Sequence, residues 1–382
     1  KEHGLEVDMA GFEREMDAQK EQSRSSGSFS GGMDMQTSFA ELGVGSSEFV
    51  GYDLTQQDSK IAAILLGGIS VDHATQGQQI EVVIGQSPFY AEGGGQLGDR
   101  GSIIGPNGVV TVEDTQSPVA GLIVQRGTVE QGEISVGAAI TASVELARRL
   151  DSSRNHSGTH ILHAALRSVL GAHVRQAGSF VAPERLRFDF SHVTALSPQE
   201  ILSVQALSNE KVRENLLVST QETTYAEAVR QGALAFFGDK YGGVVRMVSM
   251  SNGEAFSVEL CGGTHVSATG QVGTLFVLGE SSIGGGMRRI EAVTGRAAEE
   301  LFIQQAAKLE ALSQRLQTPV ADLEERLDSF ISDTEDLRRR LAALERSTLR
   351  SEAEEILAKL LAAGATAEEA PSIILRTDPA RE

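Results

Sequence analysis

Two short segments, about a hundred residues apart, hold the residues best suited to chemistry. His156 and His160 stand four positions apart in a helical pattern, so both imidazoles project from one face of a helix. Cys261 and His265 have the same spacing, but the two glycines between them indicate a turn that brings both side chains toward a common point. Three imidazoles and one thiolate form a set suited to a tetrahedral zinc ion.

Neither segment is specific alone. A histidine pair at this spacing is common on solvated helices, where it has no chemical role. Cys261 is the only cysteine, which excludes an internal disulfide and leaves a small buried apolar side chain as its alternative role. That alternative does not explain His265, which follows two glycines in a segment without clear apolar periodicity.

Composition limits the class of protein. With 382 residues, 40% of them hydrophobic, the chain has room for two to three domains with real cores. A single cysteine indicates a reducing compartment or indifference to redox state. The sequence shows neither an apolar run of ~18 residues nor a secretory leader, so we expect a cytoplasmic protein without a membrane partner. A helical pattern already under way at Lys1, without a methionine, indicates a piece of a longer chain.

Charge is unevenly distributed. The net charge of −19 disfavours phosphate binding in general, but the acidic residues concentrate near the C-terminal end. Arginines gather around the histidine pair, and two more, Arg288 and Arg289, follow a triple glycine. The first group comprises Arg148, Arg149, Arg154, Arg167, Arg175, Arg185 and Arg187. These arginines are suited to holding an RNA terminus; the alternative is ordinary surface charge paired with Asp151, Glu184 and Asp189.

The segments that must position these residues divide the chain into four parts. Residues 1–47 read as the end of a helical region and a linker rich in serine, glycine and methionine. Residues 48–146 contain short β-type runs punctuated by glycine, which predicts a small antiparallel barrel. Within them, Gly93, Gly94, Gly95 and Gln96 suit either close approach to a ligand or a tight barrel-corner turn.

Residues 147–295 are predicted to form an α/β domain and residues 296–382 a helical hairpin or coiled coil, which makes the chain an α+β multidomain protein. In the first, we expect a helix from about Ser157 to Leu170 with the histidine pair at its first turns. A second helix should begin at Pro198, with Ser197 as its N-cap, and the strands should complete one sheet backed by helices on one face. In the last part, leucines at three-four spacing on both sides of Pro319 predict two antiparallel helices.

These features also carry a family resemblance. The chain resembles the middle and C-terminal part of alanyl-tRNA synthetases over about residues 11–345. The matching blocks are Gly11-Phe12-Glu13, the Pro88–Gln96 segment, both metal motifs, the Gly232–Gly242 segment and the Arg288–Gly295 segment. Each block is weak alone, but their combination is highly specific.

The resemblance implies a proofreading hydrolase that clears seryl and glycyl esters from alanine tRNA, which it binds by its aminoacylated 3′ end. It implies His156, His160, Cys261 and His265 as ligands of one zinc ion, with Thr159 and Gln176 placing the substrate. Gly93, Gly94, Gly95, Gln96, Arg288 and Arg289 are candidate contacts to substrate or tRNA. Ser157 and Gly158 depart from the usual His-Thr-Ala-Thr-His motif, so their roles stay open.

The resemblance further implies that ATP-dependent attachment of alanine belongs to a domain missing from this chain, so we expect no ligase activity here. The leucine-rich helices are a candidate dimer contact. Two alternatives remain: a free-standing trans-editing protein, and a tRNA-binding or oligomerising module with structural zinc. The helical start and leucine-rich tail favour a synthetase segment over the first, and an ester-hydrolysis assay separates the second.

Overall fold

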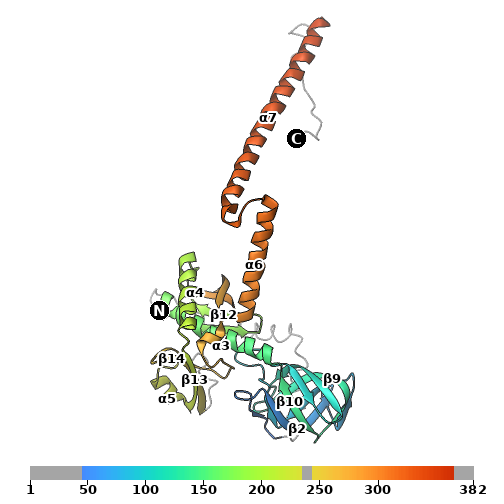
Figure 1. Ribbon diagram of the computed structural model, residues 1–382, viewed down its shortest axis with the longest axis vertical. Coiled ribbons are helices and arrows are strands. Elements are labelled where there is room, and N and C mark those ends of the chain that lie inside the picture. The colour runs from blue at the N-terminus through green and yellow to red at the C-terminus, as the bar shows by residue number, and fades with distance from the viewer. Residues whose placement is uncertain (1–44, 235–242, 365–382) are drawn as a thin grey trace, which may run out of the picture. The chain divides into compact units, whose positions relative to one another are not determined.

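The computed structural model describes residues 45–234 and 243–364, and the chain divides after Glu300 into two compact units (Figure 1). The helix and linker predicted before residue 45, most of the Gly232–Gly242 segment and the end of the chain after residue 364 lie outside the described residues. Within the described ranges, every helix is too short or too polar to cross a lipid bilayer.

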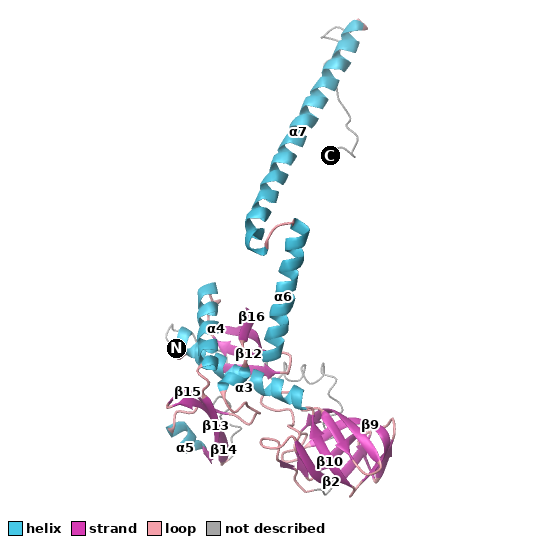
Figure 2. Ribbon diagram, in the orientation of Figure 1, coloured by secondary structure: helices cyan, strands magenta, loops and turns pink. Residues whose placement is uncertain are grey.

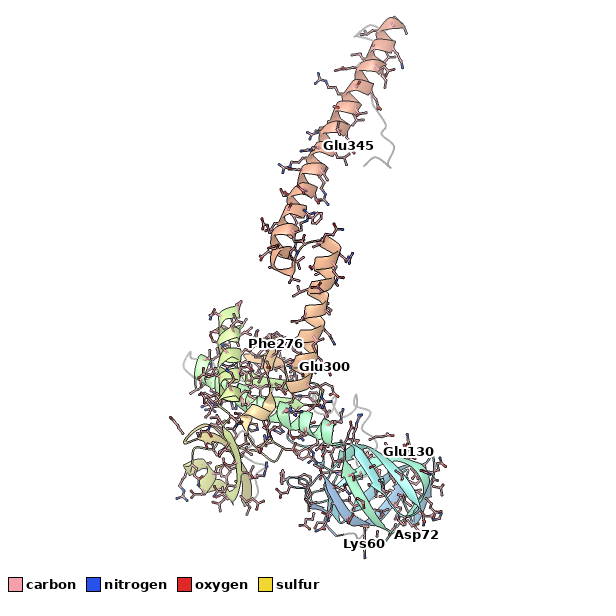
Figure 3. The ribbon with its side chains drawn as sticks, in the orientation of Figure 1. Lys60, Asp72, Glu130, Phe276, Glu300 and Glu345 are labelled. Atoms are coloured by element: carbon pink, nitrogen blue, oxygen red, sulfur yellow. The ribbon has the colours of Figure 1, made fainter. Side chains whose placement is uncertain are left out.

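The predicted barrel is confirmed. Its six strands are β2 (Gln56–Leu66), β5 (Gln79–Ile84), β7 (Gly101–Ile104), β8 (Gly108–Gln116), β9 (Val124–Ser135) and β10 (Ala139–Val144). They follow the order β10-β7-β8-β9-β5-β2, and antiparallel pairing of β10 with β2 closes the sheet. Short strands β1 (Glu48–Phe49), β3 (Ile69–Val71), β4 (His73–Thr75) and β6 (Gln86–Ser87) pair around it. The interior is apolar, whereas Lys60, Asp72 and Glu130 lie on the outside (Figure 3).

Two sheets, and not the single sheet predicted, follow the barrel. One has the order β11 (Gln176–Val181), β12 (Leu186–Ser191), β17 (Met287–Thr294) and β16 (Leu275–Gly284). The other comprises β13 (Leu217–Thr224), β14 (Val244–Asn252) and β15 (Glu254–Leu260). The sequence interpretation missed β17, which pairs with both β12 and β16 and so completes a sheet without the other three strands.

Helix α3 (Leu146–Leu170) begins eleven residues before the predicted start, because residues 146–156 contain no glycine or proline that would interrupt a helix. His156 and His160 therefore lie in its middle and not in its first turns. Leu162, Ala165 and Leu166 pack into a core shared with the four-stranded sheet and with α4 (Pro198–Arg213). As predicted, Ser197 caps α4, in a capping box with Glu200.

A buried ion pair joins α3 to the barrel. Arg149, near the start of the helix, contacts Asp99 and donates hydrogen bonds of 2.6 Å to the carbonyl oxygens of Gly51 and Pro88. Both charged side chains are about 95% buried, so removing either would leave an uncompensated charge inside the protein. Arg149 is therefore unavailable to RNA, contrary to the sequence-based expectation.

The described residues also form helices α5 (Tyr225–Arg230), α6 (Gly295–Leu316) and α7 (Leu323–Ala362), with short 3-10 turns η2 (Thr269–Val272) and η3 (Val320–Asp322) (Figure 2). The two predicted leucine-rich helices are thus present. Their leucines are exposed, with Leu309 at 46%, Leu327 at 54% and Leu337 at 63%. Packing of these helices into a hairpin or coiled coil therefore stays a prediction.

Candidate metal centre

The four predicted ligands meet at one point. The nearest ligand atoms of His156, His160, Cys261 and His265 all lie within 4.8 Å of one another. Two come from α3 and two from the turn after β15. The Sγ atom of Cys261 lies 3.2 Å from Nε2 of His156, and the ring of His265 is centred 4.6 Å from that of His156 and 4.9 Å from that of His160.

Each imidazole is held on its Nδ1 side by a neighbouring side chain. The Nδ1 atoms of His156, His160 and His265 lie 2.7 Å from Gln96 Oε1, 3.0 Å from Glu259 Oε2 and 3.1 Å from Ser157 Oγ, respectively. Partners of this kind fix the orientation of metal-binding histidines and leave Nε2 for the ion. Ser157, whose role the sequence left open, thus orients His265.

One buried atom tests whether a metal fits. Among the described residues, Nε2 of His265 is buried and has no hydrogen-bond partner. An unpaired polar atom inside a protein costs about 1–3 kcal/mol, so such atoms call for an explanation. A cation held by the three imidazoles and the thiolate would satisfy this nitrogen. The donor set, nitrogen and sulfur in a closed group of four, is the one that zinc prefers.

The charges in the cluster agree with metal binding. Burial alone would raise the pKa of the Cys261 thiol, but the neighbouring His156 and His160 outweigh it and hold that pKa well below its usual range. Burial and the charge of His156 lower the pKa of His265 to about 3, which keeps this ring neutral. Thiolate and neutral imidazole are the forms that bind metals.

The pKa of His160 is shifted in the opposite direction from that of His265. Burial would lower its pKa, but the Glu259 carboxylate and Cys261 outweigh burial and raise it to about 10. Without an ion, its proton balances the thiolate charge; an arriving cation would take over that role and release the proton.

Glu259 is a site residue that the sequence interpretation missed. Besides His160 Nδ1, its carboxylate accepts from His163 Nδ1 at 2.9 Å, and all three side chains are nearly fully buried. Burial would raise the pKa of Glu259, but the charge of His160 and hydrogen bonds from both histidines hold it well below its usual range. The signal in the sequence was a glutamate two residues before Cys261 in a strand-like run, because such residues share a face.

The turn that carries Cys261 is braced from two sides. Arg246 of β14 donates hydrogen bonds of 2.9 Å to the carbonyl oxygens of Cys261 and Gly263. The Tyr52 hydroxyl, from the barrel side, donates one of 2.6 Å to the carbonyl of Gly262. A Cβ atom on Gly263 would lie 2.0 Å from Cε1 of His156, so only glycine fits there.

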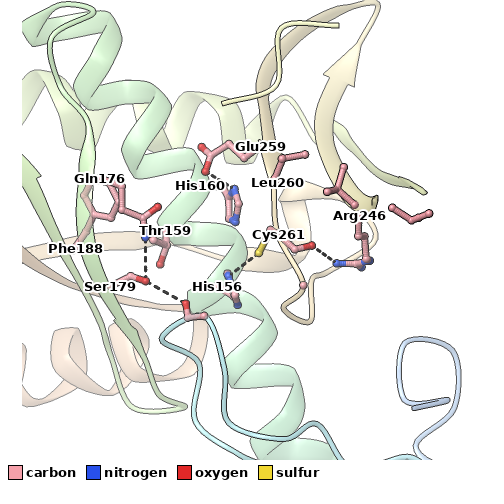
Figure 4. Close-up of a pocket in the computed structure, with 14 residues that line it drawn as sticks. His156, Thr159, His160, Gln176, Ser179, Phe188, Arg246, Glu259, Leu260 and Cys261 are labelled. Atoms are coloured by element: carbon pink, nitrogen blue, oxygen red, sulfur yellow. Dashed lines mark hydrogen bonds and ion pairs between the residues drawn. The ribbon is translucent and has the colours of Figure 1, made fainter. Parts of the chain in front are cut away.

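A cavity of about 420 Å³ opens beside the cluster. It is lined by His156, His160 and Cys261 together with the predicted substrate residues Thr159 and Gln176, and by Gly94. Figure 4 shows Thr159, Gln176 and Ser179 on one side of the pocket and Cys261 and Arg246 on the other. The structure therefore brings the predicted ligands and the predicted substrate residues into one site.

Other predicted contacts lie elsewhere. Gln96 is fully buried behind His156, and Arg288 and Arg289 on β17 do not line this pocket. Arg288 pairs with Glu280, and Arg289 binds both carboxylate oxygens of Asp189 at 2.7 and 2.8 Å. Gly158 has a packing role, because a Cβ atom there would lie 2.8 Å from the Thr294 side chain.

Several of the arginines near the histidine pair are already paired. Arg148 contacts Glu184 at 3.0 Å and Arg154 contacts Asp151 at 2.7 Å. Arg187 lies 3.8 Å from Asp189. For these three, the alternative of ordinary ion pairing is confirmed, and the pairing leaves less charge for an RNA backbone.

Two family models match this chain, one over its N-terminal part and one over the segment that carries Cys261 and His265. The family model described as "tRNA synthetases class II (A)" matches residues 1–148. The model described as "Threonyl and Alanyl tRNA synthetase second additional domain" matches residues 245–291. The second match contains β14, β15 and the turn with Cys261 and His265.

The chain is similar to curated proteins named Alanine--tRNA ligase. The one from Chloroflexus aurantiacus is 42% identical over 368 residues, covering 94% of this chain and 41% of the relative. The one from Roseiflexus sp. is 40% identical over 382 residues, covering 95% and 42%, and the one from Rhizobium johnstonii is 42% identical over 349 residues, covering 89% and 40%. The chain spans about two fifths of the length of these relatives. The chain is a segment of about that length, and it belongs to the alanine--tRNA ligase family.

Proposed function

We propose that this chain hydrolyses the ester of mischarged alanine tRNA, with seryl and glycyl esters as substrates. The proposal rests on the cavity in which three of the four candidate metal ligands, His156, His160 and Cys261, lie opposite the polar side chains of Thr159 and Gln176. The relatives are named as ligases, and we propose that ATP-dependent attachment of alanine belongs to the part of their length that this chain does not span. We further propose that alanine tRNA is the partner and the cytoplasm the location.

The need for such a hydrolysis follows from the size of the amino acids. A pocket that accepts alanine cannot exclude the smaller glycine, and it rejects an added hydroxyl by only about a hundred-fold. A second pocket can select serine by binding that hydroxyl. Alanine or glycine in the same pocket would leave the polar groups unpaired, which in favourable cases discriminates by about 10⁴–10⁵ in favour of serine. This contact therefore accounts for the seryl ester, and the glycyl ester is proposed from the family resemblance.

The polar wall offers acceptors for a seryl substrate. The Thr159 hydroxyl donates its proton to the carbonyl of Asn155 at 2.8 Å, so it presents lone pairs to a ligand. The Gln176 amide nitrogen donates to Ser179 Oγ at 3.1 Å, and Ser179 Oγ donates to Gly94 O at 3.2 Å. This chain of contacts fixes the Gln176 amide and directs its oxygen toward other donors, such as a hydroxyl or an ammonium group.

The metal would be held by His156, His160, Cys261 and His265, of which the first three line one edge of the cavity. When bound, a zinc ion polarises a carbonyl oxygen or lowers the pKa of a water molecule. The chain's own contribution is to hold the ester beside that edge through Thr159 and Gln176. Arg246, half-buried in the opposite wall, adds positive charge near the approaching phosphate of the RNA end.

The test is hydrolysis of seryl, glycyl and alanyl esters of alanine tRNA by the purified chain. We expect release of the first two and little release of the third. His160→Ala should lose metal and hydrolysis together, whereas Gln176→Ala should slow hydrolysis with metal retained. Release of none of the three esters by the metal-loaded chain would contradict the proposal and favour a binding module with structural zinc. Full activity in either variant would contradict the role of that residue.

A further inference from the structure

We propose that the barrel is part of the metal centre and that Gln96 is the positioning residue through which it acts. Nothing in the similarity to ligases assigns this role, and the sequence alone suggested a contact to substrate or tRNA. The inference rests on the proposed function for its place in the reaction, but its argument and its test concern metal binding.

The contacts of Gln96 determine which tautomer His156 adopts. The side-chain oxygen and nitrogen of a glutamine are distinguished by their neighbours. Here the backbone N–H of Thr264, which can only donate, lies 3.0 Å from the atom Oε1, so this atom must be the oxygen. The same oxygen lies 2.7 Å from His156 Nδ1, which must therefore carry a proton. In the neutral form that binds a metal, the Nε2 atom of His156, 3.2 Å from Cys261 Sγ, is then left with the lone pair.

Gln96 also joins the two halves of the ligand set. Its amide nitrogen donates to the Thr264 hydroxyl at 2.9 Å, and that hydroxyl accepts a second hydrogen bond from Ser153 at 2.8 Å. Thr264 stands directly before His265 in the ligand turn, whereas Ser153 and His156 belong to α3. One barrel side chain, fully buried, thus contacts both segments that supply ligands.

The triple glycine is the device that delivers Gln96. Gly93 and Gln96 exchange two backbone hydrogen bonds of 3.1 and 3.0 Å, which closes a tight turn with Gly94 and Gly95 at φ of 59° and 86°. A Cβ atom on Gly95 would lie 2.4 Å from the carbonyl oxygen of Ser179. Backbone bonds of 2.7 Å from Val181 N to Gly95 O and 3.0 Å from Leu97 N to Val181 O anchor the turn to β11. The glycines therefore allow two backbones to meet, and Gln96 projects from that junction into the metal cluster.

Substitutions at Gln96 separate its acceptor from its bulk. Gln96→Met keeps the volume and removes the acceptor, so His156 is free to rotate or to change tautomer. Loss of such an outer partner typically weakens metal binding by about 10–100-fold. Gln96→Glu keeps oxygens that accept from Thr264 N–H and His156 Nδ1, and it should bind metal within about three-fold of the unaltered chain.

The control is Gln125→Met. Gln125 is another buried glutamine of the barrel, 1% exposed, and its amide nitrogen donates to Ser87 Oγ at 3.1 Å, outside the metal cluster. It reports the cost of losing a buried amide in the same barrel without touching a ligand.

The experiment measures zinc affinity of the full chain by competition with a chromophoric chelator, without tRNA. We expect Gln96→Met to bind at least ten-fold more weakly than Gln125→Met, and Gln96→Glu to restore binding. Equal affinity of Gln96→Met and Gln125→Met would overturn the inference, as would Gln96→Glu binding as weakly as Gln96→Met. If Gln96→Met does not fold, Gln96→Asn replaces it, because asparagine keeps the amide but its side chain is one methylene too short to reach His156. A zinc affinity of Gln96→Asn equal to that of Gln125→Met would also overturn the inference.

These results are independent of the proposed hydrolysis. A chain that binds zinc through Gln96 but releases no ester would refute the proposed function alone. A chain that hydrolyses seryl esters and binds zinc equally well without Gln96 would refute this inference alone.

Discussion

Replacing Glu259 by glutamine changes one atom in the wall of the metal cluster. In the structure, one carboxylate oxygen accepts a hydrogen bond from Nδ1 of His163 at 2.9 Å, and the other lies 3.0 Å from Nδ1 of His160 in an ion pair. A carboxylate only accepts, so both Nδ1 atoms carry protons, and His160 presents the lone pair of Nε2 once an arriving cation has displaced its second proton. In Glu259→Gln, the amide oxygen can serve one histidine, and the amide N–H groups face a donor on the other.

The size of the effect follows from this mismatch. His163 is 1% exposed and His160 is 6% exposed, so water does not replace the lost acceptor. One buried donor without an acceptor costs about 1–3 kcal/mol of unfolding free energy in the metal-free chain. If the oxygen serves His163, His160 loses the partner that fixes its tautomer, and zinc affinity falls by about 10–100-fold, equivalent to about 1.4–2.8 kcal/mol.

Chelator competition gives the zinc affinity, and urea unfolding of the metal-free protein gives the stability. Glu254→Gln is the matched control, since Glu254 begins the same strand, is exposed and lies outside the cluster. We expect Glu259→Gln to lose affinity and stability relative to Glu254→Gln. Equal zinc affinities in the two variants would refute the reasoning that Glu259 orients His160.

Two further predictions concern the scaffold. Gly95→Ala and Gly94→Ala both place a side chain at positive φ, but only the Cβ atom at position 95 would meet another backbone, that of Ser179. We therefore expect Gly95→Ala to lose about 1–3 kcal/mol more free energy of unfolding than Gly94→Ala, measured by urea unfolding. Equal losses would contradict the tight junction at Ser179. Hydrogen bonds from Ser197 lower the pKa of Glu200 from 4.5, so its contribution to stability is present above about pH 4.5 and is lost as pH falls through the lowered value. Glu200→Gln should flatten this part of the pH dependence of urea unfolding between pH 6 and 3, and an unchanged profile would contradict it.

Local patterns predicted the elements of this fold well. Alternating apolar runs between glycines located five of the six barrel strands, and the Ser197-Pro198 pair located the start of α4, because these signals act within a few residues. The beginning of α3 and the existence of β17 were missed. Arg288 and Arg289 make β17 look polar, yet both are held by acids on neighbouring strands, so its pairing depends on residues far away in sequence.

In the candidate site, too, local sequence signals identified some residues, and contacts between distant residues were missed. Residue type and spacing identified the four candidate ligands, because a metal demands particular donors whatever the fold. Gln96 could not be placed beside them from sequence, since its contact to His156 spans 60 residues. The spacing of Glu259 from Cys261 was a signal, but its contact to His163 spans 96 residues and could not be predicted. Glutamine and glutamate are usually exposed, so composition alone favours the wrong environment for both.

We propose that the three imidazoles and the thiolate hold one zinc ion beside the cavity. X-ray absorption at the zinc edge, with metal content measured on the same purified chain, tests it most directly. We expect one zinc per chain with one sulfur at about 2.3 Å and three nitrogens at about 2.0–2.1 Å, and loss of the sulfur shell in Cys261→Ser. A chain that binds no zinc, or binds it without sulfur, would contradict the claim.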